Sequence, residues 1–292
     1  MEIVVASGKG GTGKTFVSSN LLHYLVNEVS KPSIGVDADA EAPDLVLALG
    51  GSKRVLKRVS VGGFRKARID RSKCVKCLKC FESCRFGAIT VGSDGYPAVD
   101  PYLCEGCGVC AYVCPASCVS MEVVEAGEVR VEETGCGPVV VSANLSPGAR
   151  ATGHVVYVAR DVVAKELARE LGAKHVVTDA AAGIGCAVVS SMVGADLLLL
   201  VVEPLPPSIE GGRRLAKLAE KMRLRALCIV NKYTLNEPLA KRVGEELGVE
   251  VVGRIPYDRV VAESYAMMKP LLAYAPTHPV AKALRDAFST VV

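Results

Sequence analysis

Two short runs of cysteine carry the side chains best suited to metal or redox chemistry. The first run, CVKCLKCFESC, covers residues 74–84, and the second, CEGCGVCAYVC, covers residues 104–114. Both have the spacing C-x2-C-x2-C-x3-C, and the second begins 30 positions after the first. Thiolates of cysteine bind soft metals and iron–sulfur clusters. The repeated pattern therefore indicates a metal-binding or redox module inside the chain.

Two other uses of these thiols are less consistent with the spacing. A structural zinc site usually takes four ligands from two C-x2-C pairs separated by a longer loop, and eight thiols exceed that number. Disulfides between such densely spaced cysteines would be strained. The chain lacks glutamine and has the composition of a hyperthermophile protein, a class in which intracellular disulfides do occur. The spacing, and not the cysteine count, therefore favours clusters.

The two runs resemble those of bacterial-type ferredoxins that hold two 4Fe–4S clusters. The resemblance implies that three cysteines of one run surround a cluster and that the fourth reaches the other cluster. Cluster 1 would then be held by Cys74, Cys77, Cys80 and Cys114, and cluster 2 by Cys104, Cys107, Cys110 and Cys84. Arg85 replaces the proline that usually follows such a run, whereas Pro115 is present. We expect an α+β module over residues 65–125, with strand-like segments at 87–91 and 119–123 and a turn at Asp94.

A glycine-rich loop near the N-terminus predicts phosphate binding. The segment GKGGTGKT follows an apolar strand at residues 3–5 and precedes an apolar-periodic helix at 16–25. In this context backbone N–H groups and the helix N-terminus bind phosphates. Lys14 would reach the β- and γ-phosphates, and Thr15 would ligate Mg²⁺. The expected nucleotide-binding residues of the loop are Gly8, Gly10, Gly11, Thr12, Gly13, Lys14 and Thr15.

Acidic residues follow two further apolar strands. The strand at 33–36 leads into DADAEAPD at residues 37–44, and the strand at 174–178 leads into Asp179. Carboxylates at the C-terminal edge of a parallel sheet lie where ligands bind. We expect Asp179 to hold Mg²⁺ through water and the Gly183 N–H to contact the γ-phosphate. Asp37 is a further candidate ligand of Mg²⁺, although Asp37 or Asp44 could instead cap a loop.

The segment KGGTGKT resembles the deviant phosphate loop of the MinD/Mrp/ParA superfamily, which is related to the nitrogenase iron protein. The resemblance implies an ATPase that binds ATP or ADP with Mg²⁺ and forms an ATP-dependent homodimer. It also implies that Lys9 acts on the nucleotide of the partner subunit and that Asp39 positions the attacking water. Asn231 would contact adenine, and Pro256 would complete the nucleotide site.

The rest of the chain predicts an α/β fold. Apolar strands at 196–203, 225–230 and 249–256 alternate with helices at 211–222, 238–247, 259–268 and 277–289. This alternation is typical of a mostly parallel sheet flanked by helices. With the resemblance above, it gives a P-loop NTPase of the SIMIBI type. The ATPase domain would comprise residues 1–64 and 126–292, with the bacterial-type ferredoxin domain inserted at 65–125.

Bulk properties give few further constraints. The chain has 292 residues and a formal net charge of +4, which does not by itself indicate nucleic-acid binding. The N-terminus lacks the pattern of a signal peptide, and the longest apolar stretch, residues 195–202, is too short to span a bilayer. We expect a cytoplasmic protein that binds neither nucleic acid nor membrane.

Four cysteines lie outside the predicted ligand sets: Cys118, Cys136, Cys186 and Cys228. Cys228 lies in an apolar strand and is expected in the core, and Cys118 is expected to pack beside a cluster. Cys186 follows Asp179 by seven positions, as a cluster ligand does in the nitrogenase iron protein. A third cluster that bridges two subunits through Cys186 and Cys136 is therefore a weaker hypothesis.

The leading functional hypothesis is an ATPase, stimulated by a partner, in which nucleotide-driven dimer switching is coupled to electron transfer through two 4Fe–4S clusters. The expected partner is a redox or iron–sulfur acceptor protein. The segment from Arg65 to Arg85 contains eight basic and two acidic residues, so its net charge is +6. This charge could steer an acidic partner protein toward the module, or it could offset the negative charge of the clusters. One alternative is an Mrp-type iron–sulfur carrier, although no C-x2-C follows Cys114. The other is a MinD/ParA-like spatial regulator, although the C-terminal segment is only weakly basic.

Overall fold

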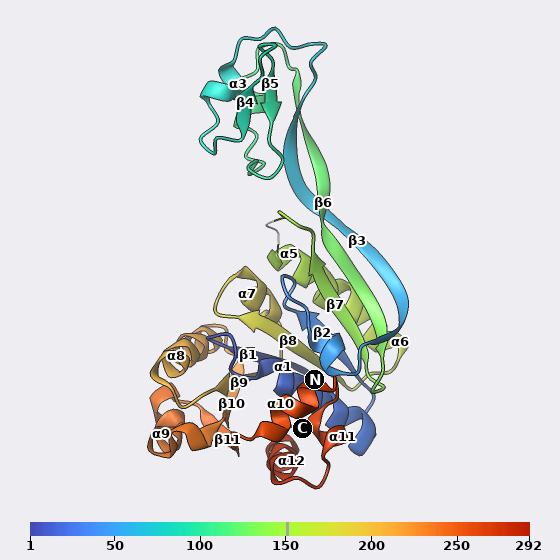
Figure 1. Cartoon of the computed structure of the whole chain (residues 1–292), viewed down its shortest axis with the longest axis vertical. Coiled ribbons are helices and arrows are strands. Elements are labelled where there is room, and N and C mark those ends of the chain that lie inside the picture. The colour runs from blue at the N-terminus through green and yellow to red at the C-terminus, as the bar shows by residue number, and fades with distance from the viewer. Residues whose placement is uncertain (150–151) are drawn as a thin grey trace. The chain divides into compact units, whose positions relative to one another are not determined.

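The computed structural model describes residues 1–149 and 152–292. The chain divides into two compact units (Figure 1). The nucleotide unit comprises Met1–Val59, Glu128–Asn144 and Thr152–Val292. The cysteine unit comprises Ser60–Gly127 and the segment that begins at Leu145. Each unit contains one of the two chemical patterns seen in the sequence.

A nine-stranded sheet forms the centre of the nucleotide unit, in the order β11-β10-β9-β1-β8-β2-β7-β6-β3. The strands are β1 Glu2–Ser7, β2 Ser33–Ala38, β3 Ser52–Ile69, β6 Val119–Thr134, β7 Val139–Leu145, β8 His175–Ala182, β9 Leu197–Val202, β10 Arg225–Asn231 and β11 Glu250–Ile255. The six neighbouring pairs from β11 to β7 are all parallel. The expected α/β fold with a mostly parallel sheet is confirmed.

Helices cover this sheet and separate its parallel strands along the chain (Figure 1). They are α1 Lys14–His23, α2 Leu45–Ala48, α5 Thr152–Tyr157, α6 Lys165–Glu170, α7 Cys186–Met192, α8 Pro206–Lys221, α9 Glu237–Leu247, α10 Arg259–Ala266, α11 Leu271–Tyr274 and α12 Pro279–Val291. Short π-helical turns extend α1 over Tyr24–Glu28 and join α5 to α6 over Val158–Ala164. α8 begins at Pro206, before the predicted residue 211, because proline is well suited to the first turn of a helix.

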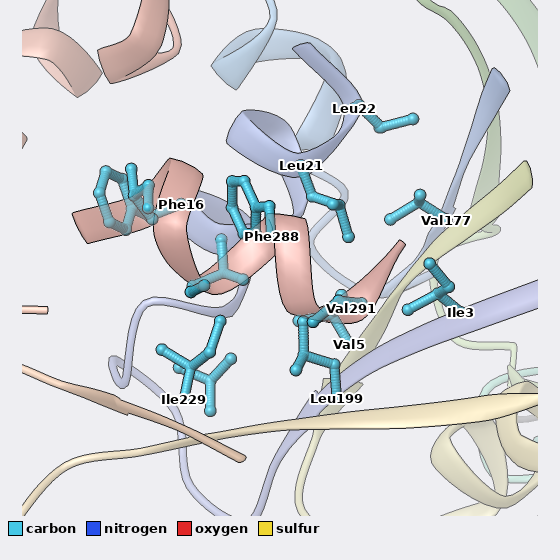
Figure 2. Packing of buried hydrophobic residues seen from close by; sticks show 14 of the residues in the cluster. Ile3, Val5, Phe16, Leu21, Leu22, Val177, Leu199, Ile229, Phe288 and Val291 are labelled. Atoms are coloured by element: carbon cyan, nitrogen blue, oxygen red, sulfur yellow. The ribbon is translucent and has the colours of Figure 1, made fainter. Parts of the chain in front are cut away.

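The apolar core lies on both faces of the sheet. Along β1, Ile3 and Val5 join one buried cluster, and Val4 and Ala6 join the other. Side chains alternate across a strand, so a strand buried on both faces is a continuous apolar run in the sequence. Figure 2 shows part of the first cluster, in which Phe288 of α12 packs among residues of α1 and the sheet.

Strands β3, β6 and β7 were not predicted as members of the main sheet. Ser52–Val59 at the start of β3 is almost entirely exposed and contains Lys53, Arg54, Lys57 and Arg58. Such a segment lacks the apolar alternation by which strands are recognised, and charged side chains of this kind are typical of edge strands. The sequence analysis assigned no strand to the start of β3 because this exposed, charged segment gives no apolar pattern, whereas β7 is buried and was missed.

The cysteine unit repeats one small motif. α3 Lys79–Glu82 and α4 Val109–Tyr112 each contain the third cysteine of a run, Cys80 or Cys110. β4 Ile89–Val91 pairs antiparallel with β5 Pro97–Val99 through the turn at Asp94, as predicted for that turn. The predicted short segment at 119–123 is instead the beginning of the long strand β6, which continues to Thr134 and buries Val129 and Val131 in its second half.

Candidate functional site

The glycine-rich loop joins β1 to α1 and is held by two close backbone approaches. Gly13 precedes α1 at a φ of +94°, and a Cβ there would lie 2.3 Å from Asn231 Nδ2. A Cβ on Gly8 would lie 2.1 Å from the backbone of Gly211 in α8. Only glycine fits at these positions. No sequence signal identified Gly211, since its role depends on a residue 203 positions away (211 minus 8).

The loop borders a cavity of about 680 Å³ in the nucleotide unit. This volume suits a ligand of nucleotide size. Nine of the predicted site residues line the cavity: Gly10, Gly11, Thr12, Gly13, Lys14, Thr15, Asp39, Asn231 and Pro256. Tyr257, Val261 and Tyr265 line it from the segment after β11, and the sequence analysis assigned them no role.

Oxygen atoms of three side chains converge beside Thr15. Its Oγ1 lies 2.6 Å from Asp179 Oδ2 and 3.0 Å from Asp44 Oδ1. Ser18 Oγ donates a 2.8 Å hydrogen bond to Asp179 Oδ1. A hydroxyl group has one hydrogen, so it can satisfy only one of two ionised carboxylates. The second contact requires a proton or a cation, and this oxygen-rich donor set fits Mg²⁺.

Burial controls the protonation of the two innermost carboxyls. Burial and the nearby charge of Asp179 raise the pKa of Asp37 well above its usual value, against hydrogen bonds from the N–H groups of Leu45 and Asp39. Burial raises the pKa of Asp179 to about 6, against the opposing effects of the Lys14 ammonium and the hydroxyls of Thr15 and Ser18. Two adjacent buried carboxyls favour a bound proton or metal.

Asp39 occupies a different environment from Asp37. Its side chain lines the cavity, and partial burial raises its pKa while the Lys14 ammonium opposes that rise. A half-buried carboxyl near Lys14 is suitably placed to accept a hydrogen bond from a water molecule. Its role in positioning the attacking water stays a prediction.

Asp44 also links Thr15 to α10. The Tyr265 hydroxyl donates a 2.6 Å hydrogen bond to Asp44 Oδ2, while Asp44 Oδ1 contacts Thr15. Burial and the neighbouring carboxylates raise the pKa of Tyr265, so its hydroxyl keeps its proton and remains a donor. The sequence suggested only that Asp44 could cap a loop, and no sequence pattern indicated a functional role for Tyr265.

Asn231 ties β10 to the phosphate loop. Its Nδ2 donates to the Thr12 carbonyl at 2.7 Å, and its Oδ1 accepts from the Lys232 N–H at 3.0 Å. Lys232 Nζ donates to the Gly11 carbonyl at 3.0 Å and to Glu203 at 2.6 Å. The sequence missed this lysine–glutamate pair. The contact of Asn231 with adenine stays a prediction.

Gly183 and Lys9 are placed away from the cavity lining. Gly183 follows β8 at a φ of +92°, and its N–H donates to the Ser7 carbonyl at 2.9 Å. A contact with a γ-phosphate would require this hydrogen bond to break. Lys9 is exposed, as a residue that acts on a partner's nucleotide must be. Both functional roles stay predictions.

The four predicted ligands of cluster 2 share one cavity in the cysteine unit. Cys84, Cys104, Cys107 and Cys110 line it together with apolar side chains that include Phe86 and Ile89. The Ala67 N–H donates to Cys104 Sγ at 3.5 Å. Thiols from both runs that meet in an apolar cavity, with a backbone donor aimed at a ligand sulfur, fit an iron–sulfur cluster.

The predicted ligands of cluster 1 also lie near one another. Cys80 and Cys118 belong to one buried cluster, against which Cys74 and Cys114 pack, and burial raises the pKa of Cys80. The Sγ atoms of Cys114 and Cys118 are 3.4 Å apart. Across residues 1–149 and 152–292, no group of three or more ligand side chains is arranged to hold a single metal ion. A 4Fe–4S cluster takes each thiolate on a different iron, so its ligands need not converge on one point.

The remaining cysteines lie outside the two cluster sites, and Cys186 lines a second cavity of about 310 Å³ together with Asp39. Cys228 is fully buried in β10, which confirms the prediction for this residue. Cys136 packs against the first core cluster, and Cys186 is exposed at the start of α7. A bridging cluster at Cys186 and Cys136 stays an untested hypothesis.

Comparison with known proteins supports the family assignment. Residues 3–271 match the family model described as the CobQ/CobB/MinD/ParA nucleotide binding domain. The chain also resembles the septum site-determining protein MinD complexed with Mg-ADP from Pyrococcus horikoshii, with a TM-score of 0.60 and 20% identity over 99% of this chain and 95% of that one. At this identity the similarity demonstrates the fold.

Two curated relatives add further detail. An uncharacterized protein of Methanocaldococcus jannaschii is 26% identical over 278 residues, which are 94% of this chain and 92% of the relative. A shorter match is 39% identical over 74 residues to one component of the Na⁺-translocating ferredoxin:NAD⁺ oxidoreductase complex of Acetobacterium woodii, covering 25% of this chain and 21% of the relative. Among the described residues no helix is long and apolar enough to span a membrane. The chain is a member of the CobQ/CobB/MinD/ParA nucleotide-binding family.

Proposed function

We propose that this protein binds and hydrolyses ATP and couples a nucleotide-driven change of its dimer to electron transfer through two 4Fe–4S clusters. The observation that carries the proposal is the meeting of Cys84 with Cys104, Cys107 and Cys110 in one apolar cavity. In a family defined by nucleotide binding, such a cavity adds a redox function to an ATPase.

The nucleotide unit would act on ATP through residues of the phosphate loop and its neighbours. Lys14 would bind the β- and γ-phosphates, and Thr15 and Asp179 would hold Mg²⁺, directly and through water respectively. Asp39 would orient the attacking water, and Lys9 would reach the nucleotide of a second subunit. Asn231 and Pro256 line the same cavity and would face the adenine.

The cysteine unit would hold the clusters and exchange single electrons through them. Cys74, Cys77, Cys80 and Cys114 would bind cluster 1, and Cys84, Cys104, Cys107 and Cys110 would bind cluster 2. Buried apolar neighbours such as Ile89 and Val119 would exclude water, which is one determinant of cluster potential. The proposed domain limits remain 1–64 and 126–292 for the ATPase and 65–125 for the ferredoxin-like module.

The proposed partner is an acidic redox or iron–sulfur acceptor protein in the cytoplasm. Two basic residues of the segment 65–85 form ion pairs on the surface. Arg71 pairs with Asp94 at 3.0 Å, and Lys73 pairs with Asp70 at 3.5 Å. Exposed pairs of this kind contribute little energy and exchange readily for a partner's carboxylates. Neither a nucleic acid nor a membrane is part of this proposal.

The test is a reductive titration of anaerobically purified protein followed by EPR, with and without Mg-ATP. We expect about eight iron atoms per chain, four from each cluster, and potentials that move when ATP binds. The matched control is Lys14→Ala, which should keep its iron and lose the response to ATP. Iron content near zero would refute the cluster proposal. Two clusters whose potentials ignore ATP would refute the coupling and would lead to an assay of cluster transfer to an apo-acceptor.

A further inference from the structure

The cysteine unit contains a fifth thiol at the site of cluster 1. Cys118 Sγ lies 3.4 Å from Cys114 Sγ, within the range of a sulfur hydrogen bond. Cys74, a second predicted ligand of that cluster, packs against the same buried cluster that contains Cys118. The Cys118 residue is only 6% exposed, so bulk water does not compete for this contact.

The backbone fixes this thiol in place. Ser117 adopts a left-handed φ of +48°, which turns the chain back toward Cys114, and its N–H donates to the Cys114 carbonyl at 3.2 Å. The Cys118 carbonyl accepts a 2.8 Å hydrogen bond from the Asp70 N–H. Cys118 therefore has limited freedom to move away from the ligand sulfur.

The internal repeat supplies a comparison within the same molecule. Cys118 follows Cys114 by four positions, and in the other repeat the residue four positions after Cys84 is Ala88. Ala88 is 1% exposed and lines the cavity that Cys84 shares with the second run. The two cluster sites thus have equivalent buried positions, of which one carries a thiol and the other a methyl group.

A 4Fe–4S cluster takes one thiolate on each of its four irons. The ferredoxin spacing already assigns four cysteines to cluster 1, so Cys118 is left as a protonated thiol. An S–H group is a weak hydrogen-bond donor, and hydrogen bonds to ligand sulfurs help to set the potential of a cluster. They stabilise the reduced state because it carries one more negative charge.

We propose that the Cys118 S–H donates a hydrogen bond to the sulfur of Cys114 and raises the potential of cluster 1. The inference rests on the proposed function, since it requires both clusters to be bound. Its consequence is that removal of the thiol lowers the potential of cluster 1 alone. Cluster 2 has Ala88 at the equivalent position and has no thiol donor there.

The experiment compares wild type, Cys118→Ala and the reciprocal Ala88→Cys, all purified anaerobically as full chains. Iron content is measured first, and EPR-monitored titrations then give the two midpoint potentials. We expect Cys118→Ala to keep its iron and to shift one potential to more negative values while leaving the other in place. Ala88→Cys should instead raise the potential that Cys118→Ala leaves unchanged.

A spectroscopic readout separates a hydrogen bond from a packing effect. We expect ENDOR of the reduced wild type to show an exchangeable proton coupled to the cluster whose potential Cys118→Ala lowers, and Cys118→Ala to lack it. Cys118→Val fills a volume similar to that of cysteine without a donor, and it replaces the alanine variant if the latter does not fold. The valine variant should show the same shift of potential.

Three results would overturn the inference. Unchanged potentials in Cys118→Ala and Cys118→Val would show that the thiol does not act on the cluster. Loss of half the iron in Cys118→Ala, together with full iron in Cys114→Ala, would make Cys118 a ligand. A shift of both potentials by the same amount would indicate a general effect on the module. A wild type without iron would instead refute the proposed function.

Discussion

At the scale of single residues, the most constrained atoms lie where the phosphate loop meets two aspartates. Thr15 Oγ1 contacts Asp179 and Asp44 at 2.6 and 3.0 Å, and one hydroxyl hydrogen cannot serve both carboxylates. Below about pH 6 a proton can occupy this site when Mg²⁺ does not. The expected consequence is a binding equilibrium for Mg-nucleotide that depends on pH.

The pH dependence follows from the direction of the Asp179 shift. Burial raises the pKa of Asp179 from 3.8 to about 6, so the group favours the folded state most below pH 3.8, and this contribution is lost as the pH rises through about 6. Mg²⁺ needs the ionised carboxylate, so its binding should release protons and weaken as the pH falls through about 6.

Titration calorimetry of Mg-ADP binding at pH 6, in buffers of different ionisation enthalpy, measures the protons released. Asp179→Asn is the matched control because the amide cannot titrate and has nearly the same shape. A wild type that releases as few protons as Asp179→Asn would contradict the assignment.

Tyr265→Phe tests the contact between α10 and the metal end of the cavity. Loss of the 2.6 Å hydrogen bond to Asp44 should lower the free energy of unfolding of the nucleotide-free protein by about 1 kcal/mol. The control is Tyr257→Phe, because that ring lines the same cavity and is 60% exposed. Equal stabilities of the two variants in urea titrations would show that the contact contributes nothing.

At the scale of the elements, the fold positions the site through the close approach of α8 to the phosphate loop. A Cβ on Gly211 would lie 2.8 Å from the backbone of Gly8. Because this contact is with backbone atoms, neither segment can move aside at a low cost in free energy. This pair of glycines therefore determines how closely the phosphate loop approaches α8. The same principle applies at Gly13, whose missing side chain leaves room for the Asn231 amide.

Gly211→Ala should reduce both stability and nucleotide affinity, although alanine normally stabilises a helix relative to glycine. Overpacking of this kind costs about 1 to 3 kcal/mol, measured as the change in the free energy of unfolding. Gly62→Ala is a suitable control because its Cβ would meet the nearest atom at an ordinary 3.5 Å. A Gly211→Ala variant as stable as Gly62→Ala, with unchanged Mg-ADP affinity, would refute the role of this approach.

At the scale of the whole molecule, one chain does not supply every predicted catalytic residue to its own cavity. Lys9 is exposed and is absent from the lining of the nucleotide cavity, whereas Lys14 is part of it. An exposed side chain in this position is accessible to a ligand of another molecule. A second subunit is the expected source of that ligand.

Lys9→Ala should retain ATP binding and lose most of its hydrolysis and its ATP-dependent dimer. Lys14→Ala, the comparison variant, should lose binding itself. Light scattering with size exclusion gives the oligomeric state, and phosphate release gives turnover. Normal turnover in Lys9→Ala would exclude action across a dimer.

The local motifs could be predicted from the sequence because their chemistry depends on spacing along the chain. The glycines before Lys14, Asp37 and Asp179 in the C-terminal halves of β2 and β8, and the strand–helix alternation after Asp179 were all recognised in this way. The sheet from β11 to β2 follows the predicted pattern, since buried parallel strands have continuous apolar runs.

Only the tertiary structure decided the contacts between distant residues. It brought Asp44 and Tyr265 together across 221 positions, placed Gly211 against Gly8, and added the exposed strand β3 to the edge of the sheet. The physical reason is that such contacts depend on how elements pack, and packing leaves no periodic signal in the chain. The sequence by itself determined which chemical groups are present, and the fold determined which of them meet.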